Sequence, residues 1–201
     1  MARPKRQDER RAQLVAATAS AIAERGLSDL RLKHIADRAG LSVGSVLYYY
    51  PDLDALLVEV HQQVLDQFYV ARVAATEAQT DPASQLRVLV TQGIPAEPDT
   101  TMRAIYELHV AAARDESHAS LLSRLWEGEV SLYESVLRLG AADGVFALRD
   151  DARAIAETVV GLEDAFDLHL TGRNTALDRD LAVRRCLSYL AVMTGADRLT
   201  V

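Results

Sequence analysis

The sequence predicts an all-α fold with about nine helices. Apolar residues recur every three or four positions along most of the 201 residues, which is the spacing of one face of a helix. No segment alternates apolar and polar residues in the manner of a half-buried strand. Glycine, proline and capping residues separate the periodic segments, as expected between helices. A chain of this length forms one medium domain or two small ones.

The first third of the chain contains four predicted helices, which cover residues 7–25, 32–39, 42–50 and 53–76. Gly26 and Gly40 are typical of helix C-termini, because glycine adopts a positive φ without strain. Ser42 and Asp52 can cap the helices that follow them. Pro51 cannot easily continue the third helix, which should therefore end near residue 50.

The other five helices are predicted directly after Asp81-Pro82 and over residues 101–114, 117–139, 151–170 and 177–193. Residues 93–99 contain two prolines and are expected to form a loop. Residues 140–146 are expected to form a turn.

Composition excludes several classes of protein. No apolar run approaches the ~20 residues that span a bilayer, and the charged N-terminus lacks the apolar stretch of a signal peptide. The single cysteine, Cys186, excludes an internal disulfide and lies among apolar residues, so we expect a small core residue there. These observations predict a cytoplasmic protein without a membrane partner.

The charge is distributed unevenly. Residues 1–50 carry nine Lys or Arg against five Asp or Glu, whereas residues 51–201 carry thirteen against twenty-four. We call residues 1–50 the head and residues 51–201 the body. A basic head on an acidic body indicates that only the head contacts a polyanion.

Within the head, two short helices joined by three residues form the arrangement of a helix-turn-helix motif, at about residues 31–50. Ala36 is small enough for the second helix to cross closely, and Gly40 can take the positive φ of the turn. The expected inward positions are all apolar, namely Leu32, Ile35, Ala39, Leu41 and Val46. With the basic N-terminus, this motif predicts binding of double-stranded DNA. The alternative is an ordinary helical hairpin.

Three consecutive tyrosines end the predicted recognition helix. Tyr50 falls on the inward side and should fill the core of the head. Tyr48 and Tyr49 should face outward or sideways, where a phenol can reach a phosphate oxygen or pack on a sugar or a thymine methyl group. The alternative is that all three rings belong to the core.

The segment LRLKHIADRAGLSVGSVLYYYPDLDALL, residues 30–57, resembles the DNA-binding domain of the TetR family of bacterial transcriptional regulators. The matching motifs are Ile-Ala at 35–36, Ala-Gly-Leu-Ser at 39–42 and Gly-Ser at 44–45. The resemblance implies a DNA-binding domain at 1–52 and a ligand-binding and dimerisation domain at 53–201. The residues expected at the DNA are Arg31, Lys33, Ser42, Val43, Gly44, Ser45, Tyr48 and Tyr49.

Three positions depart from the family pattern. Leu47 stands at a tyrosine and Leu53 at a lysine that contact phosphates in the family, and Arg31 stands at a capping Ser or Thr. Arg31 and the N-terminal basic residues can replace these anchors. The recognition helix carries no Arg, Asn or Gln for a bidentate base contact, so specificity is expected to depend on apolar contacts and DNA shape.

The C-terminal segments 151–172 and 182–195 resemble the last two helices of the subgroup that contains the choline-responsive repressor. The resemblance implies a dimer interface there, for which the expected residues are Val159, Leu162, Leu187 and Leu190. It also implies an effector pocket in the central helices. Large residues on their apolar faces are candidates to line it, or simply core residues; they are Met102, Tyr106, His109, Trp126 and Phe166.

Little else in the sequence suggests chemistry. The five histidines lack metal-ligand spacing, and no nucleotide-binding or nucleophile motif occurs, so we expect no catalytic residue, metal or cofactor. Glu163 and Asp167 share one helix face. One interpretation is a solvated or interface face whose carboxylates pair with arginine. The other is that one carboxylate enters the effector pocket.

The sequence therefore predicts a homodimeric repressor that binds a palindromic operator and is released by an unidentified small-molecule effector. The subgroup resemblance suggests choline-like cations. Two alternatives stay open. One is a helix-turn-helix regulator that acts through a protein partner without an effector. The other is a helical enzyme or ligand carrier.

Overall fold

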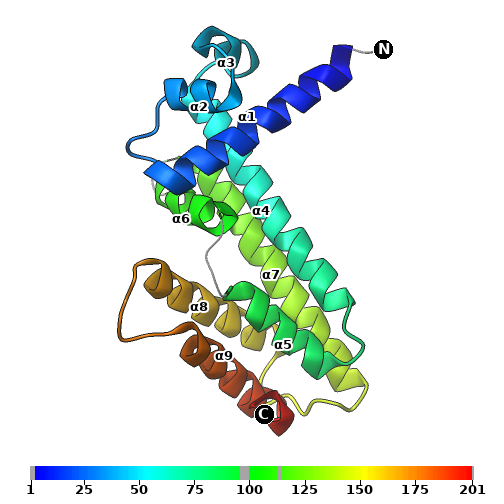
Figure 1. The fold of residues 1–201 in the computed structure, drawn as a ribbon. Helices are drawn as coiled ribbons and strands as arrows, with labels where there is room; N and C mark the ends of the chain where they lie inside the picture. Colours follow the sequence, from blue (N-terminus) through cyan, green and yellow to red (C-terminus); the bar gives the residue numbers. More distant parts are fainter. Residues whose placement is uncertain (1–2, 96–99, 113–114, 201) are drawn as a thin grey trace. The chain divides into compact units, whose positions relative to one another are not determined.

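The computed structural model describes residues 3–95, 100–112 and 115–200, and these residues form nine α-helices and one 3₁₀ helix without a strand (Figure 1). The helices are α1 Arg3–Arg25, α2 Leu32–Ala39, α3 Val43–Tyr49, α4 Leu53–Glu77, α5 Pro82–Gly93, α6 Thr100–Ala112, α7 Glu116–Ala142, α8 Ala152–Thr171, α9 Arg179–Thr194 and η1 Asp197–Thr200. The predicted all-α fold is confirmed.

Most predicted boundaries lie within three residues of the observed ones. α1 begins earlier than expected, since Pro4 is tolerated in a first helical turn. α7 continues through Gly140, and the positive φ of 70° that ends this region belongs to Gly144. The predicted turn at 140–146 therefore begins too early. The predicted helix end at Arg114 and most of the predicted loop at 93–99 lie outside the described residues.

The chain divides into two compact units. Unit 1 comprises Met1–Gln67 and Pro98–Ser123, and unit 2 comprises Phe68–Glu97 and Arg124–Val201. α4 and α7 each contribute residues to both units. The division into a DNA-binding domain at 1–52 and a ligand-binding domain at 53–201 concerns function, and it stays a prediction.

In unit 1, α1 packs against α2 and α6, and α2 packs against α3 (Figure 1). Fully buried apolar side chains from successive helices make its core, among them Leu14, Ile22, Ile35, Val46 and Leu56. Gly26 ends α1 with a φ of 75°, and the next amide, of Leu27, donates to Glu107 on α6 at 2.9 Å. The core and this hydrogen bond keep α2 and α3 packed on the rest of unit 1.

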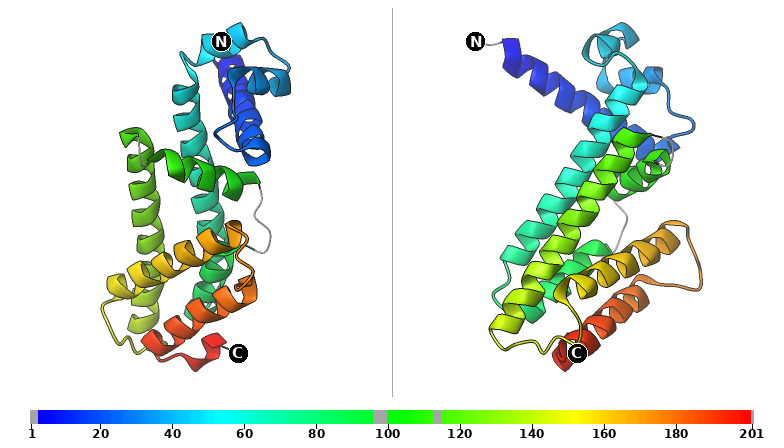
Figure 2. Two further views of the ribbon diagram at one scale, coloured as in Figure 1. Left: turned by 90° about the vertical axis from the view of Figure 1, so that its left-hand side faces the viewer. Right: turned by 180° about the vertical axis from the view of Figure 1, so that it is seen from behind.

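In unit 2, α8 and α9 run side by side in both views of Figure 2. The core beneath them is apolar and includes Cys186, which is fully buried, as predicted. Within the described residues, no helix is both long enough and apolar enough to cross a membrane.

Two histidines form a buried hydrogen-bonded pair in unit 1. His61 on α4 and His118 on α7 approach to 2.8 Å between their Nδ1 atoms, and the ring of His109 lies 6.0 Å from that of His61. Burial, and then the two neighbouring imidazoles, lower the pKa of His61 to about 3. His61 is thus a neutral core residue. No third side chain completes a metal site with the pair in the described part of the chain.

This pair makes stability depend on pH. His61 ionises near pH 6.5 in the unfolded chain but stays neutral in the folded one, so the stability it confers is present above pH 6.5 and is lost as pH falls toward 3. The loss reaches up to about 1.4 kcal/mol per pH unit within that window. Urea unfolding at pH 7 and pH 5 should show a smaller loss for His61→Leu than for the parent. His169→Gln, at an exposed position, is the control; equal losses in all three proteins would contradict the prediction.

Candidate DNA-binding site

The turn between α2 and α3 has the geometry that the sequence predicts. Gly40 adopts φ 65° and ψ 35°, and the amide of Leu41 donates to the carbonyl of Ala36 at 2.9 Å. Ser42 caps α3, because its Oγ accepts from the amide of Ser45 at 3.1 Å. The two serine hydroxyls also bond to each other at 2.9 Å. Local capping thus fixes the direction in which α3 leaves the turn.

The three tyrosines divide between the core and the surface as predicted. Tyr50 is 2% exposed and lies in the core, where the guanidinium of Arg11 stacks over its ring at 4.6 Å. Burial raises the pKa of its phenol, so Tyr50 is neutral. Tyr48 is 67% exposed. Tyr49 is half-buried and meets the Tyr48 ring edge to face at a centroid distance of 5.1 Å. The hypothesis that all three rings are core residues is wrong.

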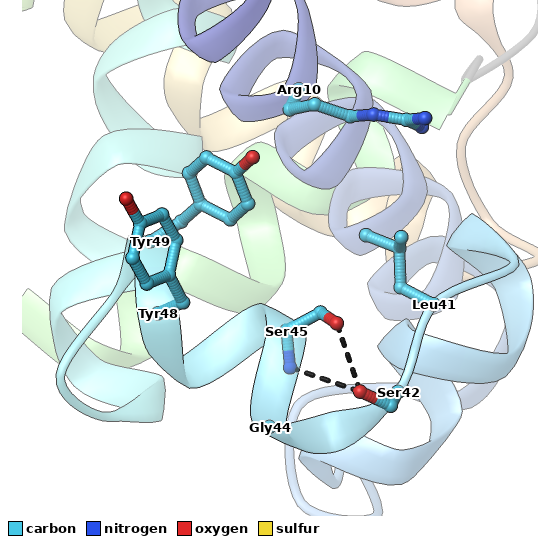
Figure 3. A pocket seen from close by; sticks show the side chains of 7 residues that line it. All are labelled: Arg10, Leu41, Ser42, Gly44, Ser45, Tyr48 and Tyr49. Carbon is cyan, nitrogen blue, oxygen red and sulfur yellow. Dashed lines mark hydrogen bonds between the residues drawn. The ribbon is translucent and has the colours of Figure 1, made fainter.

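A groove of about 370 Å³ runs beside α3 (Figure 3). Its lining residues are Arg10, Leu41, Ser42, Gly44, Ser45, Tyr48 and Tyr49. Five of the eight residues expected at the DNA line it, and the lining contains one cation and no acid. In Figure 3, Arg10 extends from α1 opposite the hydroxyl-bearing side chains of α3. Such a groove suits a sugar-phosphate backbone, since a guanidinium and hydroxyls are its usual partners.

The other three expected residues lie outside this groove. Val43 is 37% exposed on α3, and Lys33 is exposed on α2. Arg31 precedes α2, and its guanidinium donates to the carbonyls of Ser28 and Leu30 at 3.1 and 2.7 Å. Their assignment to DNA contacts stays a prediction.

Arg10 is the groove residue that sequence reasoning did not select. Its Nη1 donates to Oε1 of Gln13 at 2.5 Å, and Nε2 of Gln13 donates to the carbonyl of Ala39 at 3.0 Å. These two hydrogen bonds link Arg10 through Gln13 to Ala39 and therefore position a cation beside α3. The basic composition of the first helix could have pointed to this region of the head. Which basic residue of that helix lies beside α3 depends on how the two helices pack.

The residues predicted to line an effector pocket fall into both units. Met102, Tyr106 and His109 belong to unit 1, and Trp126 and Phe166 belong to unit 2. Met102 is buried and the other four are half-buried. Their part in one common pocket stays a prediction.

Three of the four residues predicted for a dimer interface are buried within unit 2. Val159 and Leu190 have no exposed surface and belong to the core of unit 2, as does Leu187 at 8% exposure, while Leu162 is half-buried. A side chain buried within its own protomer has no surface to contact a partner. The exposed large apolar residues of α8 and α9 are instead Leu168 and Val192.

The face that carries Glu163 and Asp167 is buried, so the expectation of a solvated face is wrong. Glu163 accepts from Nη2 of Arg72 at 3.0 Å and from the hydroxyl of Tyr133. Arg72 also pairs with buried Glu129 and donates to the carbonyl of Leu89. The expected arginine partner is present, but it lies in the core. No pattern in the sequence distinguishes Arg72 from the other nineteen arginines.

The capped recognition helix, its glycine turn and its basic groove define a helix-turn-helix DNA-binding protein. A sequence profile described as "Bacterial regulatory proteins, tetR family" matches residues 14–60. The HTH-type transcriptional regulator BetI of Burkholderia ambifaria is 31% identical over 194 residues, which cover 94% of this chain and 95% of that protein. The chain belongs to the TetR family of transcriptional regulators and is not an enzyme.

Solved structures agree in fold. A TetR transcription regulator from Haloarcula marismortui superposes with a TM-score of 0.85 at 23% identity, covering 93% of this chain and 99% of that one. A transcriptional regulator from Saccharomonospora viridis, solved in complex with choline, gives a TM-score of 0.83 at 18% identity, with 91% and 96% covered.

Proposed function

We propose that this regulator is a repressor that binds an inverted-repeat operator as a homodimer and is released by a small-molecule effector. The observation that carries the proposal is the groove beside α3, where Arg10 of α1 lies opposite the hydroxyl groups of the recognition helix in a TetR-family chain (Figure 3). The net charge of the body is strongly negative, so the head is the part suited to a polyanion. Such a repressor acts in the cytoplasm, where the bacterial chromosome lies.

Dimerisation through α8 and α9 is supported by exposed apolar side chains on both helices. Leu168 is 63% exposed and Val192 is 58% exposed. Large apolar groups in water favour a partner surface that covers them. A dimer would present two copies of α3 to successive major grooves, which is why the operator should be an inverted repeat.

An effector is proposed from the family and from the choline complex of the Saccharomonospora viridis neighbour. Choline-like cations are therefore the first compounds to assay. An effector acts only if it binds one conformation of the dimer more tightly than another.

The test is selection of random duplex DNA by the purified protein at about 0.15 M salt. Enrichment of an inverted repeat is the expected result. Enrichment of a single half-site would argue against the dimer. Binding without any enriched sequence would overturn the proposed function. The selected operator then serves to screen candidate effectors for release.

Arg10 provides a variant for the same assay. Arg10→Ala should weaken binding by a similar factor on every sequence and reduce the slope of log K against log salt by roughly 1 per head, because one phosphate contact is lost. Arg149→Ala removes the same charge from an exposed position in unit 2 and should change neither quantity. A change in base preference with Arg10→Ala would contradict the backbone role.

A further inference from the structure

The exposed face of α3 is apolar. Of the large hydrophobic residues that are exposed in the described part of the chain, three lie on or beside this face: Val43 at 37%, Leu47 at 42% and Tyr48 at 67%. Val43 and Leu47, at positions i and i+4, share one side of the helix, and Tyr48 borders that side one residue further on. Apolar groups held in water at a binding helix indicate an apolar partner.

The polar groups of α3 are few, and its serine hydroxyl is already bonded. The Oγ atoms of Ser42 and Ser45 bond to each other, and Ser42 also receives the amide of Ser45. The helix sequence VGSVLYY contains no Arg, Lys, Asn, Gln, Asp or Glu. It therefore lacks every side chain that makes a bidentate contact with a base edge.

In the major groove, the base edges present mostly hydrogen-bonding groups. Their prominent apolar group is the 5-methyl of thymine. We propose that Val43, Leu47 and Tyr48 read the operator chiefly through thymine methyl groups. This inference rests on the proposed function and names the chemistry that its operator must present to α3.

The spacing of the two aliphatic residues fits this reading. Val43 and Leu47 are one helical turn apart, which is about 6 Å along the axis. The rise between base pairs is about 3.4 Å, so the two side chains reach methyl groups up to about two steps apart. The Tyr48 hydroxyl adds one hydrogen bond at the edge of the same face. Each half-site should therefore contain a short cluster of thymines.

The experiment replaces single thymines of the selected operator with deoxyuridine, which removes the methyl group and keeps every hydrogen-bonding group. At one to three positions in each half-site, binding should weaken roughly three- to tenfold, as expected for loss of a buried methyl-sized contact. Deoxyuridine between the half-sites should have no effect. The salt dependence should not change, because no phosphate contact is lost.

Protein variants show which side chain contacts which thymine of the operator. Val43→Ala and Leu47→Ala should each abolish the deoxyuridine effect at a different position, since the methyl contact is then already lost. Val70→Ala and Leu139→Ala are matched controls, because both residues are more than 60% exposed on other helices. These controls should leave the effect intact.

Two failures are distinguishable. An enriched operator that tolerates deoxyuridine at every position would overturn methyl reading and leave the proposed function standing, with DNA shape as the source of specificity. An absence of any enriched operator would overturn the proposed function, and the inference with it.

Discussion

Replacing Arg72 with methionine is expected to destabilise the protein by about 3–5 kcal/mol, the range for breaking a buried ion pair from one side. Arg72 is 2% exposed and bonds to Glu129, Glu163 and the carbonyl of Leu89. Its removal leaves two carboxyl groups in an apolar core without a cation. Urea unfolding of the parent and the variant at pH 7 measures the difference.

The charges of this network imply one bound proton. Burial raises the pKa of Glu129 and of Glu163, and Arg72 opposes the rise in both. Burial lowers the pKa of Arg72, but the two glutamates outweigh it and the guanidinium stays charged. Glu163 accepts from both Arg72 and Tyr133, which suits a carboxylate. We therefore assign the bound proton to the Glu129 carboxyl group.

This assignment supplies the matched control. Glu129→Gln replaces a protonated acid with a neutral isostere and should change stability by less than about 1 kcal/mol. Glu163→Gln removes the carboxylate that receives two donors and should cost more. Equal losses in the two glutamine variants would contradict the assignment of the proton.

The defect of Arg72→Met should also depend on pH. Without the guanidinium, the pKa values of both carboxyls rise further above their unfolded values. A raised pKa in the folded state means stability that is present at low pH and lost as pH rises. The variant should therefore lie closer to the parent at pH 5 than at pH 8. A defect of the same size at both values would indicate lost packing as its cause.

The helices and the head could be predicted from sequence because their determinants are local. Gly40 and Ser42 define the turn and the cap through their own backbone and side chain. Tyr50 could be placed in the core from its register after Val46. Only the start of α1 and the end of α7 differed noticeably, and there the decisive groups were a proline in a first turn and Gly144 with its positive φ.

The rest depends on contacts between residues far apart in the chain. Arg72 meets Glu129 and Glu163 across 57 and 91 positions, and no periodicity signals which arginine is buried. Gly93 shows the same dependence, because a Cβ there would overlap the Glu163 carboxylate. The burial of the predicted interface residues could not be foreseen for a related reason: an apolar helix position does not reveal whether its own core or a partner covers it.

Replacing Tyr50 with alanine is expected to destabilise the head by about 3–5 kcal/mol, as for other large aromatic truncations in a core. Its ring lies in the core of unit 1 and beneath Arg11, and it follows α3 directly. The cavity should loosen α3 and abolish operator binding. Thermal unfolding followed by circular dichroism, together with operator binding, measures both effects.

Two further variants separate packing from contact with DNA. Tyr50→Phe keeps the ring and should retain both stability and binding, because the ring and not the hydroxyl fills the core. Tyr48→Ala removes an exposed ring and should reduce binding with little change in stability. If Tyr50→Ala bound the operator as the parent does, α3 would not need the core beneath it. The geometry of the recognition helix would then be set by its glycine turn and serine cap alone.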